Sequence, residues 1–292
     1  MIEIRTSKKT DIPSLKSIWK ICFGDDDEYI EFFFTNKYVD ENTYVLTLDG
    51  ICAAMLTVIP VKTETPAGMA FDSAMLYAIA THPKYKGRGY STELMEYTAK
   101  SLSEKKIYSL ILVPAEESLF NFYAKRGYKA IFSVRECFYH NEDINISWKS
   151  TYKCDLFSVD TNEYINLRNQ QLQGKFFISY GPEEISYQKK LSLLSGGDLF
   201  KIVCGNSTGC ATIERVNSKK IIIKELLISD DFINDVLVKI ATVFPADLYV
   251  ARFPFFKGVN TNGNIRPFGM IRYLGNVNET DIPEGYLGFA YD

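Results

Sequence analysis

The chain has 292 residues, and its 33 Lys and Arg against 36 Asp and Glu give a formal net charge of −3. This slight negative charge gives no support to nonspecific nucleic-acid binding, which depends on a basic surface. The apolar runs are too short to span a bilayer, and the first residues do not form a signal peptide, so we expect a cytoplasmic protein with no membrane partner. The length predicts about two domains.

The cysteines and histidines exclude several kinds of catalytic site. Six cysteines are scattered without a C-x-x-C pair, and only His82 and His140 are present. We therefore expect reduced thiols and no metal. A Ser/His/Asp hydrolase would depend on one of these two histidines, and no G-x-S-x-G elbow occurs.

The first 140 residues predict alternating strands and helices. Asp49-Gly50 between two apolar runs is a strong hairpin signal, and Asp11 with Pro13 offers a helix N-cap and a first-turn proline. The expected strands are 2–5, 43–48, 51–60, 71–80, 108–114 and 129–136, and the expected helices are 7–22, 26–36, the segment after 89 to about 105, and 117–126.

The strand expected at 71–80 leads into a basic turn with two glycines and then a helix. The turn reads Lys86-Gly87-Arg88-Gly89-Tyr90-Ser91. Backbone N–H groups and the helix dipole at such a place attract anions, and glycine lets a phosphate approach the backbone. The turn therefore predicts a polyphosphate site. It matches neither G-x-x-x-x-G-K-[ST] nor G-x-G-x-x-G, so two common nucleotide sites are excluded.

This turn resembles the acetyl-CoA signature [Q/R]-x-x-G-x-[G/A] of the GNAT superfamily of N-acetyltransferases, with Lys86 and Ser91 as mild departures. A second segment, Phe122 to Tyr128, resembles the family's Y-x-x-x-G-[F/Y], although Glu116 stands where the family often has Asn. The resemblance implies that Tyr123 is the general acid toward the CoA sulfur. The cofactor-binding residues that it implies are Ile79, Ala80, Thr81, Lys86, Gly87, Arg88, Gly89, Tyr90 and Ser91.

After the polar stretch 140–153, the order of elements recurs in weaker form. Helices are expected at 162–173, 182–194 and 231–243, and strands at 198–204, 209–215, 219–228 and 247–251. We therefore expect an α/β chain of the acyl-CoA N-acyltransferase fold, with a mixed central sheet flanked by helices and a second, degenerate copy of the fold. The predicted domains are an acetyl-CoA-binding domain at 1–143 and the degenerate copy at 150–292.

The second copy is expected to lack a CoA site. Ser229-Asp230-Asp231 stands where the glycine turn should be, and its two carboxylates would repel an anion. We expect the block 253–256 to pack between the domains and 257–264 to form a loop.

The tandem layout resembles the enhanced-intracellular-survival-type acetyltransferases, but 292 residues are too few for their third, sterol-carrier-like domain. Those enzymes use a C-terminal carboxylate as base, which Asp292 would imitate. The other candidate bases are Asp72, Glu116 and Glu117, and Tyr77 is a candidate for the wall of the acceptor cleft.

The resemblance implies an N-acetyltransferase that moves an acetyl group from acetyl-CoA to a primary amine of a small molecule or peptide by direct attack. Two alternatives are a non-catalytic acyl-CoA-binding regulator and a tandem-fold aminoacyl-transferase that uses charged tRNA. The complete CoA loop and the pI of about 5.6 argue against the latter, so we expect no nucleic-acid partner. Assembly into a homo-oligomer is left open.

Overall fold

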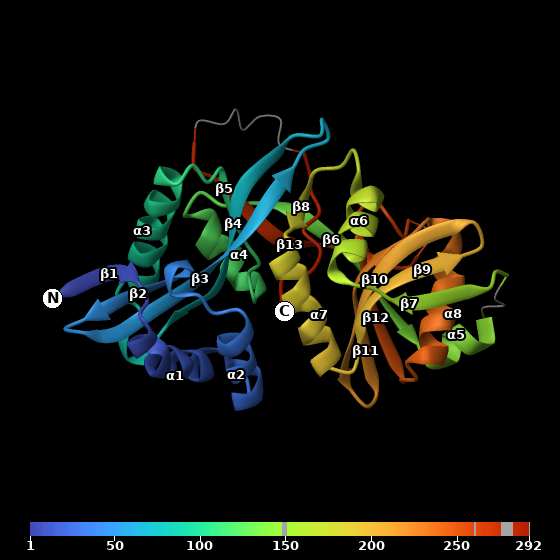
Figure 1. Cartoon of the computed structure of the whole chain (residues 1–292), viewed down its shortest axis with the longest axis horizontal. Helices are drawn as coiled ribbons and strands as arrows, with labels where there is room; N and C mark the ends of the chain where they lie inside the picture. The colour runs from blue at the N-terminus through green and yellow to red at the C-terminus, as the bar shows by residue number, and fades with distance from the viewer. Residues whose placement is uncertain (148–150, 260, 276–282, 292) are drawn as a thin grey trace. The chain divides into compact units, whose positions relative to one another are not determined.

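The computed structural model describes residues 1–147, 151–259, 261–275 and 283–291 (Figure 1). Their contacts form two compact units. The first contains the described residues of Met1–Lys62, Phe71–Val113 and Ile271–Glu279. The second contains those of Thr63–Ala70, Pro114–Met270 and Thr280–Asp292.

The first unit is a mixed sheet with helices packed on it. Its strands lie in the order β1-β2-β3-β4-β5, with β1/β2 and β2/β3 antiparallel and β4/β5 parallel. The predicted hairpin at Asp49-Gly50 is present, and both residues have the positive φ that a tight hairpin turn needs, 49° and 82°. The elements are β1 (Ile2–Thr6), α1 (Ile12–Phe23), α2 (Asp27–Asn36), β2 (Thr43–Leu48), β3 (Ile51–Glu64), β4 (Ala70–Thr81), α3 (Tyr90–Glu104) and β5 (Ser109–Leu112).

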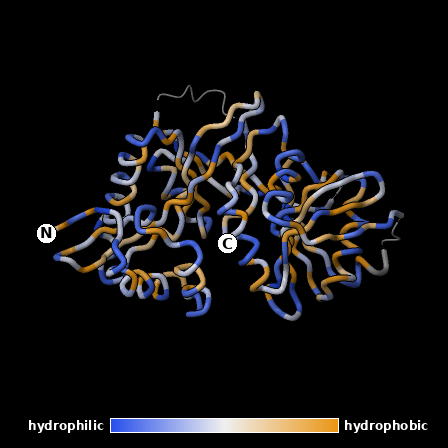
Figure 2. Tube along the Cα trace, in the orientation of Figure 1, coloured by the Kyte–Doolittle hydropathy of each residue, from blue (hydrophilic) through white to orange (hydrophobic). Residues whose placement is uncertain are grey.

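Strands of the second unit follow one another in the order β13-β6-β12-β11-β10-β9-β7. Figure 2 shows apolar residues along these strands and polar ones at the turns. The elements are α4 (Glu117–Ala124), β6 (Lys129–His140), α5 (Asn141–Ser147), β7 (Cys154–Ser158), α6 (Thr161–Leu172), β8 (Phe177–Tyr180), α7 (Pro182–Leu194), β9 (Asp198–Cys204), β10 (Ser207–Asn217), β11 (Lys220–Leu227), α8 (Ile233–Val243), β12 (Leu248–Pro254) and β13 (Asn264–Tyr273).

The two halves of the chain share one topology, which confirms the predicted fold class. In the second half β7/β9, β9/β10 and β10/β11 are antiparallel, and β11/β12 is parallel. A strand, two helices, three neighbouring strands, a helix and a parallel strand therefore follow one another in each half of the chain. β8, between the two helices of the second half, is an addition that the sequence did not predict.

One strand of the first half of the sequence, β6, pairs with a strand of the second half, and we call this the strand exchange. β6 pairs antiparallel with β12, from His140↔Leu248 to Val134↔Pro254. At the end of β13, by contrast, the Leu274 N–H donates to the Tyr108 carbonyl (3.0 Å), which precedes β5. The two contact units therefore do not follow the predicted boundaries 1–143 and 150–292, which remain a proposal about the duplicated halves.

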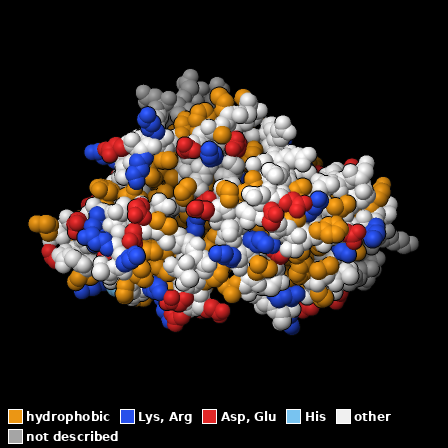
Figure 3. Space-filling model, in the orientation of Figure 1, with side chains coloured by type: hydrophobic (Ala, Val, Ile, Leu, Met, Phe, Trp, Pro, Cys, Tyr) orange, Lys and Arg blue, Asp and Glu red, His pale blue; other side chains and the backbone are white. Residues whose placement is uncertain are grey.

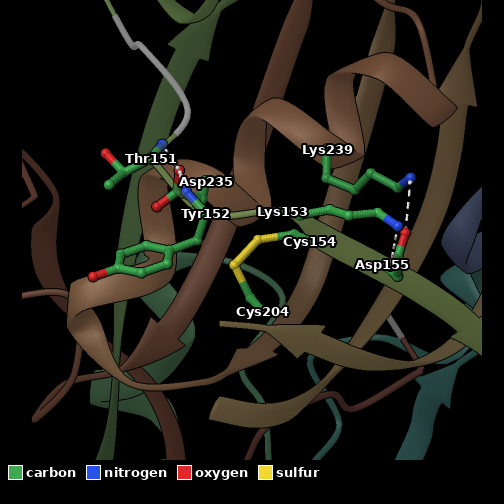
Figure 4. Close-up of a disulfide and its surroundings, with 8 residues drawn as sticks. All are labelled: Thr151, Tyr152, Lys153, Cys154, Asp155, Cys204, Asp235 and Lys239. Carbon is green, nitrogen blue, oxygen red and sulfur yellow. Dashed lines mark hydrogen bonds and ion pairs between the residues drawn. A yellow bond between two sulfur atoms is a disulfide. The ribbon is translucent and has the colours of Figure 1, made fainter. Parts of the chain in front are cut away.

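A disulfide joins Cys154 to Cys204 in the second unit (Figure 4). The two residues are direct partners in the β7/β9 ladder, with a Cα–Cα distance of 4.1 Å. Asp235 of α8 accepts the N–H groups of Thr151 and Tyr152, just before β7 (2.6 and 3.1 Å). The expectation of reduced thiols is therefore wrong for this pair, because sheet pairing brings together cysteines that lie far apart in the sequence.

We predict that alkylation of the denatured, unreduced protein marks four cysteines, because Cys22, Cys52, Cys137 and Cys210 are free. Reduction before alkylation should raise the number to six, since it opens the Cys154–Cys204 bond. Peptide mass spectrometry distinguishes these outcomes. Six marked cysteines without reductant would contradict the bond.

A buried ion pair crosses the second unit from α6 to β11. Arg168 is 1% exposed, Glu225 is fully buried, and Arg168 Nε lies 3.0 Å from Glu225 Oε2. Arg168 also donates to the carbonyls of Ile178 (2.7 Å) and Leu287 (3.1 Å), so it fastens β8 and the C-terminal residues to the sheet. Burial is the largest single effect and lowers the pKa of Arg168, but Glu225 together with three neighbouring tyrosines outweighs it, so the pKa lies above its ordinary value.

We predict that Arg168→Met lowers the free energy of unfolding by about 3–5 kcal/mol, because it leaves Glu225 buried and unpaired. A matched control is Lys201→Met, which breaks the partly exposed pair of Lys201 with Glu163 and should cost about 1 kcal/mol or less. Chemical denaturation measures both. Equal losses of unfolding free energy in the two variants would contradict the larger contribution expected from the buried pair.

Candidate functional site

The candidate site begins where two parallel strands of the first unit diverge. β4 pairs with β5 from Ser73↔Ser109 to Met75↔Ile111. β5 then ends at Leu112, while β4 continues to Thr81. Beyond Met75, the backbone N–H and C=O groups of β4 on that side have no ladder partner in β5. Such groups are able to form hydrogen bonds with a ligand placed between the strands.

The extended backbone of β4 is interrupted at Ala78 in this diverging part, and we call this interruption a bulge. Ala78 has φ +50°, a conformation that costs a non-glycine residue about 1–3 kcal/mol. Tyr77, Ala78 and Ile79 are half-buried in succession, so the usual alternation of buried and exposed residues fails here. Bulges re-aim side chains and are common beside active sites. No pattern in the sequence predicted this feature.

The predicted glycine turn follows β4 directly. The 3-10 turn Pro83–Tyr85 leads to Gly87 and Gly89, whose φ values are +78° and +84°. Gly89 is the N-cap of α3 and has no side chain to cap the helix. A Cβ at either glycine would meet no atom within 4 Å, so the space beside them is open. The backbone conformation therefore requires glycine here, and an anion can approach the start of α3.

Positive charge surrounds the turn. Lys86 and Arg88 are exposed, and Lys84 Nζ and Arg88 Cζ lie 5.5 and 5.9 Å from the centre of the Tyr85 ring. On the face drawn in Figure 3, by contrast, basic and acidic side chains are interspersed. The basic residues of the turn are thus a local feature suited to a compact polyanion.

The predicted cofactor-binding residues lie on three consecutive parts of the first unit. Ile79, Ala80 and Thr81 end β4, residues 86–89 form the turn, and Tyr90 and Ser91 start α3. The Thr81 hydroxyl oxygen is buried and has no hydrogen-bond partner among the described residues. Such a polar atom gains from a ligand that can pair with it.

Three residues of α1 and α2 contact the last part of β4. The Cys22 thiol donates to the Thr81 carbonyl (3.4 Å), and burial raises its pKa while Lys86 lowers it. The Tyr77 hydroxyl lies 3.0 Å from that of Tyr29, and its ring packs edge-on against Trp19. No sequence pattern predicted that Cys22 would lie beside the site. That Tyr77 lines an acceptor cleft stays a prediction.

Tyr123 belongs to the second unit, near the end of α4. It is 7% exposed, and its ring packs edge-on against Tyr128, with the centroids 5.9 Å apart. Burial raises the pKa of Tyr123 to about 12, and Arg126 opposes this shift. The phenol therefore keeps its proton at neutral pH and is able to donate it. Its role as an acid stays a prediction.

The candidate bases are all exposed or outside the described residues. Asp72 lies near the start of β4, at the opposite end of the strand from the turn, and pairs loosely with Lys62 (3.6 Å). Glu116 and Glu117 are exposed at the start of α4, and Asp292 lies outside the described residues. In the described part of the chain, no three His, Cys, Asp or Glu residues are grouped to hold a metal ion. No helix there is long and apolar enough to cross a membrane.

Comparison with known proteins gives a family match for the first part of the chain. Residues 3–131 match the family model described as an acetyltransferase (GNAT) domain. These residues contain both the diverging strands and the glycine turn. A comparison with curated proteins finds no match.

Solved structures show the same fold over nearly the whole chain. A GCN5-related N-acetyltransferase from Anabaena variabilis is 18% identical with a TM-score of 0.75, covering 94% of this chain and 73% of its own. A probable N-acyltransferase from Enterococcus faecalis is 15% identical (TM-score 0.72; 94% and 73%). Eis1 from Mycobacterium abscessus is 10% identical (TM-score 0.67; 93% and 74%). At these identities the likeness shows the fold, and it spans both halves.

We predict that Gly89→Asp weakens CoA binding at least tenfold, about 1.4 kcal/mol, because it puts a carboxylate where the pyrophosphate would lie. Gly50→Asp is a matched control, since Gly50 also has positive φ and open space beside it but lies in the β2/β3 turn. Calorimetry on both folded variants measures the affinity. Unchanged affinity in Gly89→Asp would contradict the assignment of the turn.

Proposed function

We propose that this protein transfers the acetyl group of acetyl-CoA to a primary amine of a small molecule or peptide. The observation that carries the proposal is the open, basic glycine turn at the end of a diverging, bulged strand, in the part of the chain that matches a GNAT domain. The cytoplasm, where acetyl-CoA is available, is the proposed location.

The proposed binding mode uses backbone groups more than side chains. The N–H groups at the start of α3, with Lys86 and Arg88, would bind the pyrophosphate. The β4 backbone from Ile79 to Thr81 would pair with the pantetheine amides in the way that a neighbouring strand does. The thioester would then lie toward the bulge at Ala78.

The proposed reaction is direct attack by the neutral amine on the thioester carbonyl. A C–N bond forms, the C–S bond breaks, and the amine loses one proton to solvent or to a nearby base. Tyr123 would donate its proton to the departing thiolate and regain one from solvent. A buried phenol whose pKa is about 12 keeps that proton throughout the neutral range.

Release of free thiol from acetyl-CoA across a panel of amines tests this function. An N-acetyltransferase should release thiol in proportion to the acetylated amine, and the product should be detected by mass spectrometry. A non-catalytic acyl-CoA-binding regulator, which the same turn would also suit, should bind CoA in calorimetry and release no thiol with any amine. The tandem-fold aminoacyl-transferase would instead require charged tRNA.

We predict that Tyr123→Phe lowers kcat by roughly ten- to ten-thousand-fold, the range of general acid catalysis, with little change in CoA affinity. Tyr128→Phe is the control, because it removes a hydroxyl from the neighbouring ring (5.9 Å) and keeps a residue that the family motif accepts. Steady-state kinetics with a good acceptor separate kcat from binding. Near-normal turnover in Tyr123→Phe would make Tyr123 a packing residue.

A further inference from the structure

The second unit repeats the strand divergence of the candidate site. β11 pairs in parallel with β12 from Lys220↔Leu248 to Ile223↔Ala251, and β11 then continues to Leu227. A register shift against β10 leaves Lys224 without a paired residue in the β10/β11 ladder, just as Ala78 interrupts β4. The second copy therefore keeps the backbone plan of a cofactor site.

A lysine spans the diverging ends of these two strands. After β12 the chain turns back at Pro254, whose carbonyl accepts the Lys257 N–H (2.9 Å). Lys257 Nζ then donates to the carbonyl of Ile228, the residue that follows β11 (3.0 Å). The side chain of Lys257 thus connects the end of β12 to the end of β11, where the first copy leaves its strands open.

At the position of the first copy's glycine turn, the second copy has Asp230, whose carboxylate binds the chain after β12. Asp230 Oδ1 accepts the N–H of Gly258 (3.0 Å), and Oδ2 accepts that of Val259 (3.1 Å). Two adjacent backbone N–H groups bind an anion well, and here that anion belongs to the chain itself. Gly258 has φ +67°, and a Cβ there would lie 3.2 Å from Arg135, so this close approach requires glycine.

Arg135 of β6 holds the same segment from another side. Its Nε donates to the Lys257 carbonyl (2.9 Å), Nη1 to the Gly263 carbonyl (3.1 Å) and Nη2 to the Phe255 carbonyl (3.2 Å). β6 lies beside β12 because of the strand exchange described above. The three hydrogen bonds of Arg135 thus come from a strand that belongs to the first half of the sequence.

We propose that residues 254–259, the closing segment, permanently occupy the cofactor position of the second copy, with Lys257 between the diverging strands and Asp230 in place of a bound phosphate. This inference rests on the proposed function only for the location of that position, which is taken from the first copy. The second copy then has a structural role and binds no cofactor, because its own chain closes the site.

Acylation of Lys257 reports whether the segment is closed. Burial lowers the pKa of Lys257, while Asp230 opposes this shift. A lysine whose pKa is lowered reacts faster than an ordinary one once it is exposed, because more of it is the free amine. Slow labelling of Lys257 therefore requires that the closing segment stays in place and keeps the Lys257 amine on the Ile228 carbonyl.

The experiment labels the full-length protein with N-acetoxysuccinimide near neutral pH and follows Lys257 and the exposed Lys219 by peptide mass spectrometry. Lys257 should react at least tenfold more slowly than Lys219. Arg135→Ala should remove most of this protection. Arg266→Ala is the matched control, because Arg266 binds Glu136 and the Pro267 carbonyl but not the closing segment, and it should leave the protection intact.

Saturating CoA should leave the labelling of Lys257 unchanged. The proposal is overturned if Lys257 reacts as fast as Lys219 in the wild type, if CoA changes its labelling, or if Arg266→Ala exposes it as much as Arg135→Ala. If Arg135→Ala does not fold, Asp230→Asn, which loses one of the two carboxylate acceptors, should raise the labelling several-fold. Absence of any CoA binding in calorimetry would contradict the proposed function and leave the labelling result standing.

Discussion

Both halves of the molecule are subject to one constraint: where two parallel strands stop pairing, the backbone groups between them must find other partners. Buried N–H and C=O groups left unpaired cost free energy, so these groups pair with solvent, with a ligand or with another part of the chain. β4 and β5 meet the constraint next to an open glycine turn, which leaves the place to a ligand. β11 and β12 meet it with Lys257, a side chain of the chain itself.

The same constraint gives the two halves different tasks. The first half keeps the bulge at Ala78 and two positively charged residues beside the glycines. In the second half, the residue after the bulged Lys224 is Glu225, whose buried pair with Arg168 joins α6, β8 and the C-terminal residues. A buried ion pair gives definite geometry more than net stability, which suits a supporting role.

Much of the fold could be predicted from local sequence patterns. Asp49-Gly50, the glycine turn and the recurring order of elements depend on neighbouring residues, and each was found. The first helix begins at Ile12 and not at Ser7, because Pro13 takes its first turn and a 3-10 turn precedes it. β13, the exchange of β6, the pair of Arg168 with Glu225 and the Cys154–Cys204 bond escaped prediction, since each depends on residues brought together only by the sheet. The bulge at Ala78 could not be predicted, because alanine is not a residue type that indicates a positive φ.

The central claim is that one chain, built from two copies of an acyl-CoA fold, keeps one working cofactor site. Calorimetric titration of the full-length protein with acetyl-CoA tests this most directly. The account predicts one molecule bound per chain, in a single transition. Two molecules per chain with similar affinity would contradict the closure of the second copy, and no binding at all would contradict the site in the first.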